Sequence, residues 1–446
     1  MENNSELKKM TPSQILVNSF LIIIAAGTIL LMLPIATVDG KGNDFITALF
    51  MTTSAVAVTG LAVIDISTKF TIFGQVVIMV LVQLGGIGIM TFSSIIMMMI
   101  GKRISYNEKV ILKEGLNQDS MGGIIRFIRR VIKIILLIEG IGAVILTMGF
   151  MRTMPLGKAI YYGIFHAVSA FCNAGFALFP NNLIAVQKNP LIILTIAFLI
   201  IIGGIGFGVI SGMIEYYRSG TKKLSLTSKL AMKITFVLLL IGTLVVLIVE
   251  YSNMGTLGKM NIFEKIINAF FQSVTTRTAG FNSLDIAKLQ PATIFVFLIL
   301  MFIGASPGST GGGIKTTTFG VILYSVIANI KNRKHVEIEN RTISWKIINR
   351  AFTILIISIS YITIITCSIL LFEKIGIVEV IFEVISAFGT VGLSMGITPS
   401  LSVFSKILII LTMFIGRVGP LTFVLALGEE EASTKYKYPE ENVIVG

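Results

Sequence analysis

The sequence predicts an all-α integral membrane protein in which four pseudo-symmetric repeats surround one central pore. Of the 446 residues, 54% are hydrophobic and 13% are charged, whereas a soluble protein carries about 25% charged residues. Eight apolar runs have the length of a membrane span, which is about 20 residues. A glycine turn recurs four times at intervals of about 110 residues, and self-similarity of this kind indicates an internal repeat.

This composition excludes a water-soluble enzyme, a nucleic-acid reader and a disordered protein. The net charge of +13 fits a membrane protein that gathers Lys and Arg on one side of the bilayer, so no nucleic acid is expected as a partner. Cys172 and Cys367 are too few for a disulfide framework, and His166 and His335 are far apart in the chain. We therefore expect no resident cofactor and no metal cluster.

The apolar runs define the expected spans. They are Ser13–Ala36, Phe73–Ile100, Val131–Met151, Pro190–Tyr216, Leu230–Tyr251, Ala292–Ile330, Ile347–Phe372 and Phe404–Leu427. The connections after the second, fourth and sixth runs hold more than half of the 36 Lys and Arg residues. Basic loops stay in the cytoplasm, so both termini are expected there as well.

The other four connections each contain a short apolar segment followed by a glycine turn. The segments are Asp44–Ala57, Lys158–Phe171, Ile262–Thr275 and Val378–Phe388. They are too short to cross a bilayer and suit re-entrant pore helices. The expected division is a cytoplasmic N-terminus (1–12), repeats 13–101, 126–217, 229–331 and 346–428, and a cytoplasmic C-terminal tail (429–446).

The four glycine turns are the candidate selectivity filter. Irregular backbone survives at membrane depth only where it is buried in protein or lines a watery path. Glycine allows successive carbonyl groups to turn inward, where their oxygens can replace the water shell of a cation. The preceding short helices would point their negative C-terminal ends at the ion. The filter residues are Val58, Thr59, Gly60, Asn173, Ala174, Gly175, Thr278, Ala279, Gly280, Thr390, Val391 and Gly392.

A glycine-rich stretch inside the sixth run, 304–315, is the candidate gate. A straight helix cannot continue through Pro307 and its glycines. Either the stretch is a mobile plug below the filter, or it is a kink packed against neighbours. A phosphate-loop reading fails because Ile314 separates Gly313 from Lys315 and no strand precedes. The gate residues are Gly304, Ala305, Ser306, Pro307, Gly308, Ser309, Thr310, Gly311, Gly312, Gly313 and Lys315, together with Arg417.

Arg417 lies in the middle of the eighth run. A charge there costs at least about 2.5–3.5 kcal/mol on insertion scales, so the guanidinium should face the pore or bind carbonyl groups. Snorkelling to the interface is the alternative. The acids Asp65, Asp285 and Glu383 are interpreted as solvated loop residues rather than as an attracting outer vestibule.

The glycine turns, the stretch 304–315 and the segment Phe414–Leu421 together resemble the Trk/Ktr/HKT superfamily of potassium transporters, in particular its Ktr-type membrane subunit. The resemblance implies one potassium filter per chain, a homodimer, and a cytoplasmic ring of nucleotide-binding regulatory subunits. In this family, a serine at the first filter glycine is associated with sodium passage, and this chain has Gly60 there. Sodium as a coupling or activating ion, including symport, is left open.

The expected function is potassium translocation across a bacterial cell membrane by a multi-pass protein. The alternative is a secondary transporter of another monovalent cation or small solute. Four similar repeats, rather than two inverted ones, count against that alternative. A membrane enzyme would need a Ser/His, paired-Asp or metal-ligand set at membrane depth. The sequence offers only His166 and isolated acids, so we expect no enzymatic activity.

Overall fold

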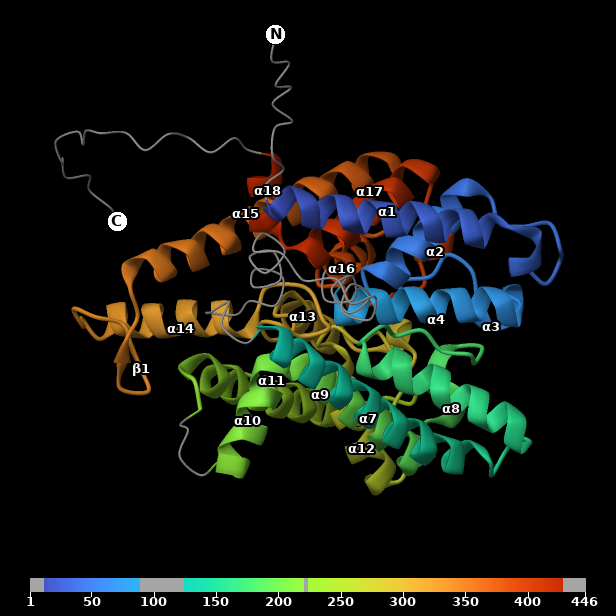
Figure 1. The fold of residues 1–446 in the computed structure, drawn as a ribbon, viewed down its shortest axis with the longest axis horizontal. Coiled ribbons are helices and arrows are strands. Elements are labelled where there is room, and N and C mark those ends of the chain that lie inside the picture. The colour runs from blue at the N-terminus through green and yellow to red at the C-terminus, as the bar shows by residue number, and fades with distance from the viewer. Residues whose placement is uncertain (1–11, 89–123, 220–223, 428–446) are drawn as a thin grey trace, which may run out of the picture.

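A computed structural model describes residues 12–88, 124–219 and 224–427 (Figure 1). The terminal segments predicted to be cytoplasmic lie almost entirely outside these ranges, as does most of the first basic loop. In the described part, nearly all regular structure is helical. One small hairpin, formed by β1 (Glu337–Ile338) and β2 (Arg341–Thr342), is the exception. The prediction of a helical protein is therefore confirmed.

Four helices are long and apolar enough to cross a membrane, and each begins one predicted repeat. They are α1 (Pro12–Met32), α7 (Ile124–Phe150), α11 (Leu226–Val249) and α15 (Trp345–Phe372). The other four predicted spans, the second of each predicted repeat, are shorter or broken. By length and apolar character, the described residues contain four spans, or five if one bent pair is counted. The full count of eight stays a prediction.

Two of the predicted spans are not continuous helices, which corrects the expectation. The run Pro190–Tyr216 divides into α9 (Pro190–Ile205) and α10 (Phe207–Ser219), which meet at 93°. The last run divides into α17 (Val403–Val418) and α18 (Pro420–Leu427). The breaks lie at Gly206 and Gly419, whose φ angles are +100° and +97°. Only glycine adopts such angles readily, and they interrupt the helical hydrogen-bond ladder.

The second and sixth predicted runs also differ from a single straight helix. Helix α4 (Ile72–Ile87) ends at Gly88, whose φ is +91°. The sixth run separates into α13 (Pro291–Phe302) and α14 (Thr316–Ile330), with residues 303–315 as a loop between them. The sequence predicted that a helix could not continue through this stretch, and the structure confirms the interruption.

The four short segments before the glycine turns are helices. They are α2 (Phe45–Val56), α8 (Leu156–Phe171), α12 (Ile262–Thr275) and α16 (Ile377–Phe388). Asp44 caps α2, and Asn261 with Glu264 forms a capping box on α12. The remaining short pieces are α3 (Ile66–Lys69) and the 3-10 turns η1 (Pro34–Ala36), η2 (Asn182–Val186), η3 (Ile286–Lys288) and η4 (Thr398–Ser400).

The C-terminal ends of the short helices are buried, whereas the long helices carry strongly exposed apolar side chains. Phe50, Phe171 and Phe388 on short helices are fully buried, whereas Ile22, Ile248 and Leu371 on long helices are 68%, 73% and 82% exposed. An outer belt of exposed aliphatic side chains suits lipid. The first and last quarters of the chain are neighbours, since α1 contacts α18 and α2 contacts α17 (Figure 1).

Candidate functional site

The four glycine turns have one backbone conformation in common. In each turn the residue two positions before the glycine is not glycine and yet has a positive φ. These residues are Val58 (56°), Asn173 (60°), Thr278 (64°) and Thr390 (48°). The glycines themselves, Gly60, Gly175, Gly280 and Gly392, have φ between 71° and 92°. A positive φ is uncommon for Thr and Val, and residues held in such strain cluster at functional sites.

The four turns meet in a closed cycle. A Cβ atom added to Gly175 would lie 2.7 Å from the carbonyl oxygen of Ala279, which precedes the third glycine. In the same way Gly60 faces the carbonyl of Ala174, and Gly280 faces that of Val391. Gly392 faces the carbonyl of Thr59 and so returns to the first turn. The structure thus brings the four predicted filter turns together.

Hydroxyl groups on the short helices hold the turns. Ser54 Oγ accepts a hydrogen bond from the Gly60 amide at 3.0 Å, and Ser386 Oγ accepts one from the Gly392 amide at 3.1 Å. In the second turn Ser169 Oγ donates instead to the Phe176 carbonyl at 2.8 Å. The first and fourth turns are therefore alike in this contact: in both, the serine hydroxyl binds a glycine amide rather than a carbonyl group.

The segments that follow the second and fourth turns are tied back to the short helices. His166, buried in α8, accepts at Nε2 from the Leu178 amide at 3.2 Å. Glu383 of α16 accepts from Ser394 Oγ at 2.7 Å and from Thr398 Oγ1. Glu383 is only 1% exposed, so its interpretation as a solvated loop acid is wrong. Glu383 is an internal brace, because its carboxylate binds the hydroxyl groups of Ser394 and Thr398 in the segment that follows the fourth turn.

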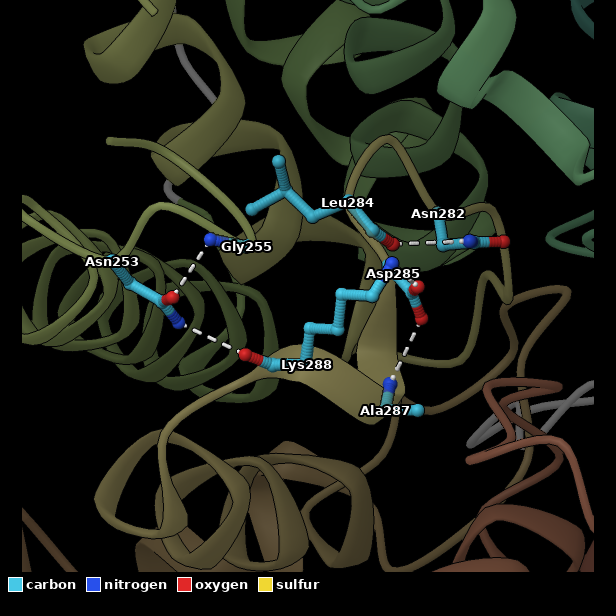
Figure 2. Close-up of polar contacts among 7 residues, drawn as sticks. All are labelled: Asn253, Gly255, Asn282, Leu284, Asp285, Ala287 and Lys288. Carbon is cyan, nitrogen blue, oxygen red and sulfur yellow. Dashed lines mark hydrogen bonds and ion pairs between the residues drawn. The ribbon is translucent and has the colours of Figure 1, made fainter. Parts of the chain in front are cut away.

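The segment after the third turn is held in place by hydrogen bonds, both within itself and to the turn that follows α11 (Figure 2). Asn282 Nδ2 donates to the Leu284 carbonyl at 3.1 Å, and Asp285 accepts from the Ala287 amide at 3.2 Å. Asn253, from the turn that follows α11, donates to the Lys288 carbonyl at 2.9 Å. Asp285 is therefore a capping residue of η3, and Asp65 caps α3 in the same way.

The candidate gate, residues 304–315, folds back on itself beside the turns. The Gly304 amide donates to the Ile314 carbonyl at 2.9 Å, which closes the loop. Residues in the middle of the loop contact the fourth glycine turn and the C-terminal end of α8. The Gly312 amide donates to Thr390 Oγ1 at 2.9 Å, and Thr310 Oγ1 donates to the Phe171 carbonyl at 3.3 Å.

The loop backbone lies so close to the turns that only glycine fits at two positions. A Cβ on Gly312 would stand 2.7 Å from Thr390 Cγ2, and one on Gly311 would stand 2.7 Å from the Ala305 Cβ and overlap the Thr278 hydroxyl. Real Cβ atoms are not found at these separations. The loop therefore packs directly on Thr278 and Thr390, the positive-φ residues of turns three and four.

The two basic candidates of the gate both bind carbonyl oxygens. Lys315 Nζ donates to the Gly311 carbonyl at 2.7 Å. The Arg417 guanidinium donates to the carbonyls of Thr310 and Gly85, so it joins the loop to α4. The prediction that Arg417 binds carbonyl groups is confirmed. Gly85 as its second partner was not foreseen, since nothing in the sequence marks that carbonyl.

The side chain of Asn173 links two turns. Its amide is hydrogen-bonded to Thr278 Oγ1 at 3.3 Å. With the amide oxygen toward Thr278, the nitrogen also reaches the carbonyls of Ala170 and Ile200 at 3.3 and 3.2 Å. Asn173 thus steadies the turn through its side chain. Within the described ranges, no group of three or more His, Cys, Asp or Glu side chains could hold a metal ion.

A largely helical protein with apolar helices long enough to span a membrane, and with four glycine turns packed against one another, has the form of a membrane transport protein. A family model described as TrkH, cation transport protein, matches residues 1–436, and the chain belongs to this family. It is 44% identical to the Ktr system potassium uptake protein B of Bacillus subtilis, over 98% of this chain and 97% of the relative.

Two further comparisons agree with this membership. The chain is 40% identical to the potassium/sodium uptake protein NtpJ of Enterococcus hirae, over 98% of both proteins. The crystal structure of the potassium transporter TrkH from Vibrio parahaemolyticus has the same fold, with a TM-score of 0.75. That match covers 96% of this chain and 87% of the solved one at 17% identity.

Proposed function

We propose that this protein is the potassium-translocating subunit of a Ktr-type potassium uptake system. The observation that carries the proposal is the closed cycle of close approaches from Gly60 through Gly175 and Gly280 to Gly392. Such a cycle suits a filter built from four pseudo-symmetric repeats around one pore. The complete fold would then have eight transmembrane helices and four re-entrant pore loops.

Conduction would work by replacing water with carbonyl oxygens. The filter backbone, from Val58 to Gly60 and at the three equivalent turns, supplies oxygens that are already in place, so a potassium ion can shed its hydration shell at low cost. The short helices end at these turns and add their negative dipole ends. A membrane potential favours entry by about 2.3 kcal/mol per charge per 100 mV.

The loop 304–315 would gate this path. It lies against Thr278 and Thr390, and Arg417 holds it at the Thr310 carbonyl. In this position the loop and the guanidinium would oppose a cation that leaves the filter. Opening would require the loop to leave these partners, and the glycines within it leave the backbone free to move.

The remaining features of the proposal come from the relatives. The name of the Bacillus subtilis protein describes one component of a Ktr system, which supports a membrane subunit with further partners. We infer a homodimer in a bacterial cell membrane, with both termini in the cytoplasm on a ring of nucleotide-binding regulatory subunits. The Enterococcus hirae relative is named for potassium and sodium, which supports sodium as a coupling or activating ion.

The test is rubidium uptake by vesicles that contain the purified full-length protein, with potassium, sodium and lithium as competitors. We expect uptake that potassium blocks far better than sodium or lithium. A vesicle preparation with no rubidium uptake contradicts the proposal. Uptake of another monovalent cation or a small solute without rubidium flux would instead support the alternative, a secondary transporter.

A further inference from the structure

One side-chain amide joins the second and third glycine turns. Asn182, the first residue of η2, donates from Nδ2 to the Gly175 carbonyl at 3.0 Å. Its Oδ1 accepts a hydrogen bond at 3.3 Å from the backbone amide of Asn282, which follows shortly after Gly280. The Leu183 amide adds to this link by donating to the Asn282 carbonyl at 3.1 Å. The segment after the second turn is thereby tied to the segment after the third.

The orientation of the Asn182 amide follows from its partners. A backbone carbonyl can only accept a hydrogen bond, and a backbone N–H can only donate one. The nitrogen must therefore face Gly175 and the oxygen must face Asn282. Asn182 has φ +59°, a left-handed conformation that Asn tolerates better than most residues do. Asn181 has φ +61° and makes no capping hydrogen bond, so it shares this backbone conformation without the link to the turns.

The carbonyl that Asn182 binds belongs to the candidate filter. Among the described residues, Gly175 is the one filter glycine whose carbonyl receives a side-chain hydrogen bond. A carbonyl oxygen has two lone pairs, so this bond occupies one of them and leaves the other for a second partner. The backbone of Gly175 is also packed on Gly280, because a Cβ on Gly175 would stand 2.8 Å from Gly280 Cα. The Gly175 carbonyl is therefore less free to rotate than a glycine carbonyl without such a donor.

We propose that Asn182 is a positioning residue for ion selection, which holds the Gly175 carbonyl at a distance that suits potassium and keeps the filter from contracting around sodium. This inference rests on the proposed function and names a determinant of its specificity. Sodium is the smaller cation, so carbonyl oxygens must move closer together to replace its water shell. A tethered oxygen resists this movement, whereas a free one follows the smaller ion. Asn182 acts through the Gly175 carbonyl rather than as a ligand of the ion.

Competition against rubidium uptake measures this effect in vesicles that contain the full-length protein. The readout is the ratio of the sodium and potassium concentrations that halve the uptake. This ratio does not depend on how much of the protein is folded, whereas the maximal rate does. Asn182→Gly removes both side-chain hydrogen bonds and keeps a residue that adopts a positive φ readily. We expect the ratio to fall by about fivefold, the factor that corresponds to one net hydrogen bond.

Asn182→Asp separates the bond to Gly175 from the bond to Asn282. A carboxylate keeps an acceptor for the Asn282 amide and has no donor for the Gly175 carbonyl. The ratio should therefore fall as it does in the glycine variant. Asn181→Gly and Asn181→Asp are the matched controls, because they make the same changes in backbone freedom and in charge one residue away. Both controls should keep the native ratio.

A native ratio in Asn182→Asp overturns the inference, and so does an equal fall in the Asn181 controls. A fall in Asn182→Asp without one in Asn182→Gly would assign the effect to charge and also overturn it. If Asn182→Gly does not fold, the comparison of Asn182→Asp with Asn181→Asp provides the test by itself. A potassium-selective native protein with unchanged ratios in the Asn182 variants refutes this inference alone, whereas a native protein without rubidium uptake refutes the proposed function.

Discussion

Gly392 faces the carbonyl oxygen of Thr59 so closely that an added Cβ would overlap it, and the last glycine turn of the chain therefore packs on the first. More than 330 residues separate the two in sequence. This contact closes the cycle that the other three glycines begin. It also makes each turn depend on the next one, because the glycine of each turn packs against a carbonyl oxygen of the turn that follows in the cycle.

We expect Gly392→Ala to reduce the preference for potassium over sodium by roughly tenfold, since overpacking a tight site costs about 1–3 kcal/mol. Its Cβ would overlap the Thr59 carbonyl. Gly396→Ala is the matched control, because Gly396 has φ +94° and no atom within 4 Å of an added Cβ. Competition of sodium against rubidium uptake measures the ratio. Equal ratios in both variants would argue against a filter at Gly392.

Arg417→Gln should raise the basal rubidium flux by roughly tenfold, since hydrogen bonds to charged groups contribute about 1.5–3 kcal/mol. The variant loses the guanidinium that holds the Thr310 and Gly85 carbonyls together. Arg417→Lys should also be leaky, because an ammonium group lacks the planar fork that spans two acceptors. The exposed Arg350→Gln is the control. A lower flux in Arg417→Gln would show that the guanidinium does not restrain the loop.

Glu250→Gln should lower the free energy of unfolding by about 1–3 kcal/mol, because an amide cannot accept all the donors that a carboxylate accepts. Glu250 is fully buried and accepts hydrogen bonds from the Gln290 amide (2.8 Å), Thr293 (2.6 Å), Asn253 (2.6 Å) and Thr256 (2.7 Å). Thermal unfolding in detergent gives the midpoint. The exposed Glu337→Gln should leave it unchanged, and an unchanged midpoint in Glu250→Gln would contradict a bracing role.

Asp44→Ala should destabilise the protein by about 1 kcal/mol at neutral pH, the usual value of an N-cap. Partial burial alone would raise the pKa of Asp44, but the hydrogen bonds from Thr47, together with the Asp44 backbone amide and the charge of Lys406, outweigh this effect and lower the pKa below 3.8. A carboxylate with a lowered pKa stabilises the fold above its unfolded pKa, and the gain is lost as the pH falls through the folded pKa.

The difference between Asp44→Ala and the native protein should therefore be constant from neutral pH to about pH 5 and shrink below 3.8. Unfolding midpoints measured across this range test it. The difference in stability between Asp44→Asn and Asp44→Ala should stay constant over the same range, because neither variant has a titrating group at this position. A difference that persists at low pH in the alanine variant would assign the effect to packing instead.

The helices of this protein could be predicted from local sequence because hydrophobic runs and capping residues act over a few neighbours. The four short helices before Gly60, Gly175, Gly280 and Gly392 were foreseen, as was the interruption at Pro307. The breaks at Gly206 and Gly419 were not, because glycine is common in membrane helices and its sequence context does not reveal a positive φ. The roles assigned to the filter and gate residues stay predictions.

The sequence by itself determined the class of the protein, the sites of its glycine turns and the charge of Arg417 within an apolar run, since these follow from composition, spacing and the cost of burying charge. Only the tertiary structure decided which groups meet. Glu383 became an internal brace, Thr390 a partner of Gly312, and Gly85 an acceptor for Arg417 because contacts between distant segments depend on how helices pack and bend, and no local pattern encodes that geometry.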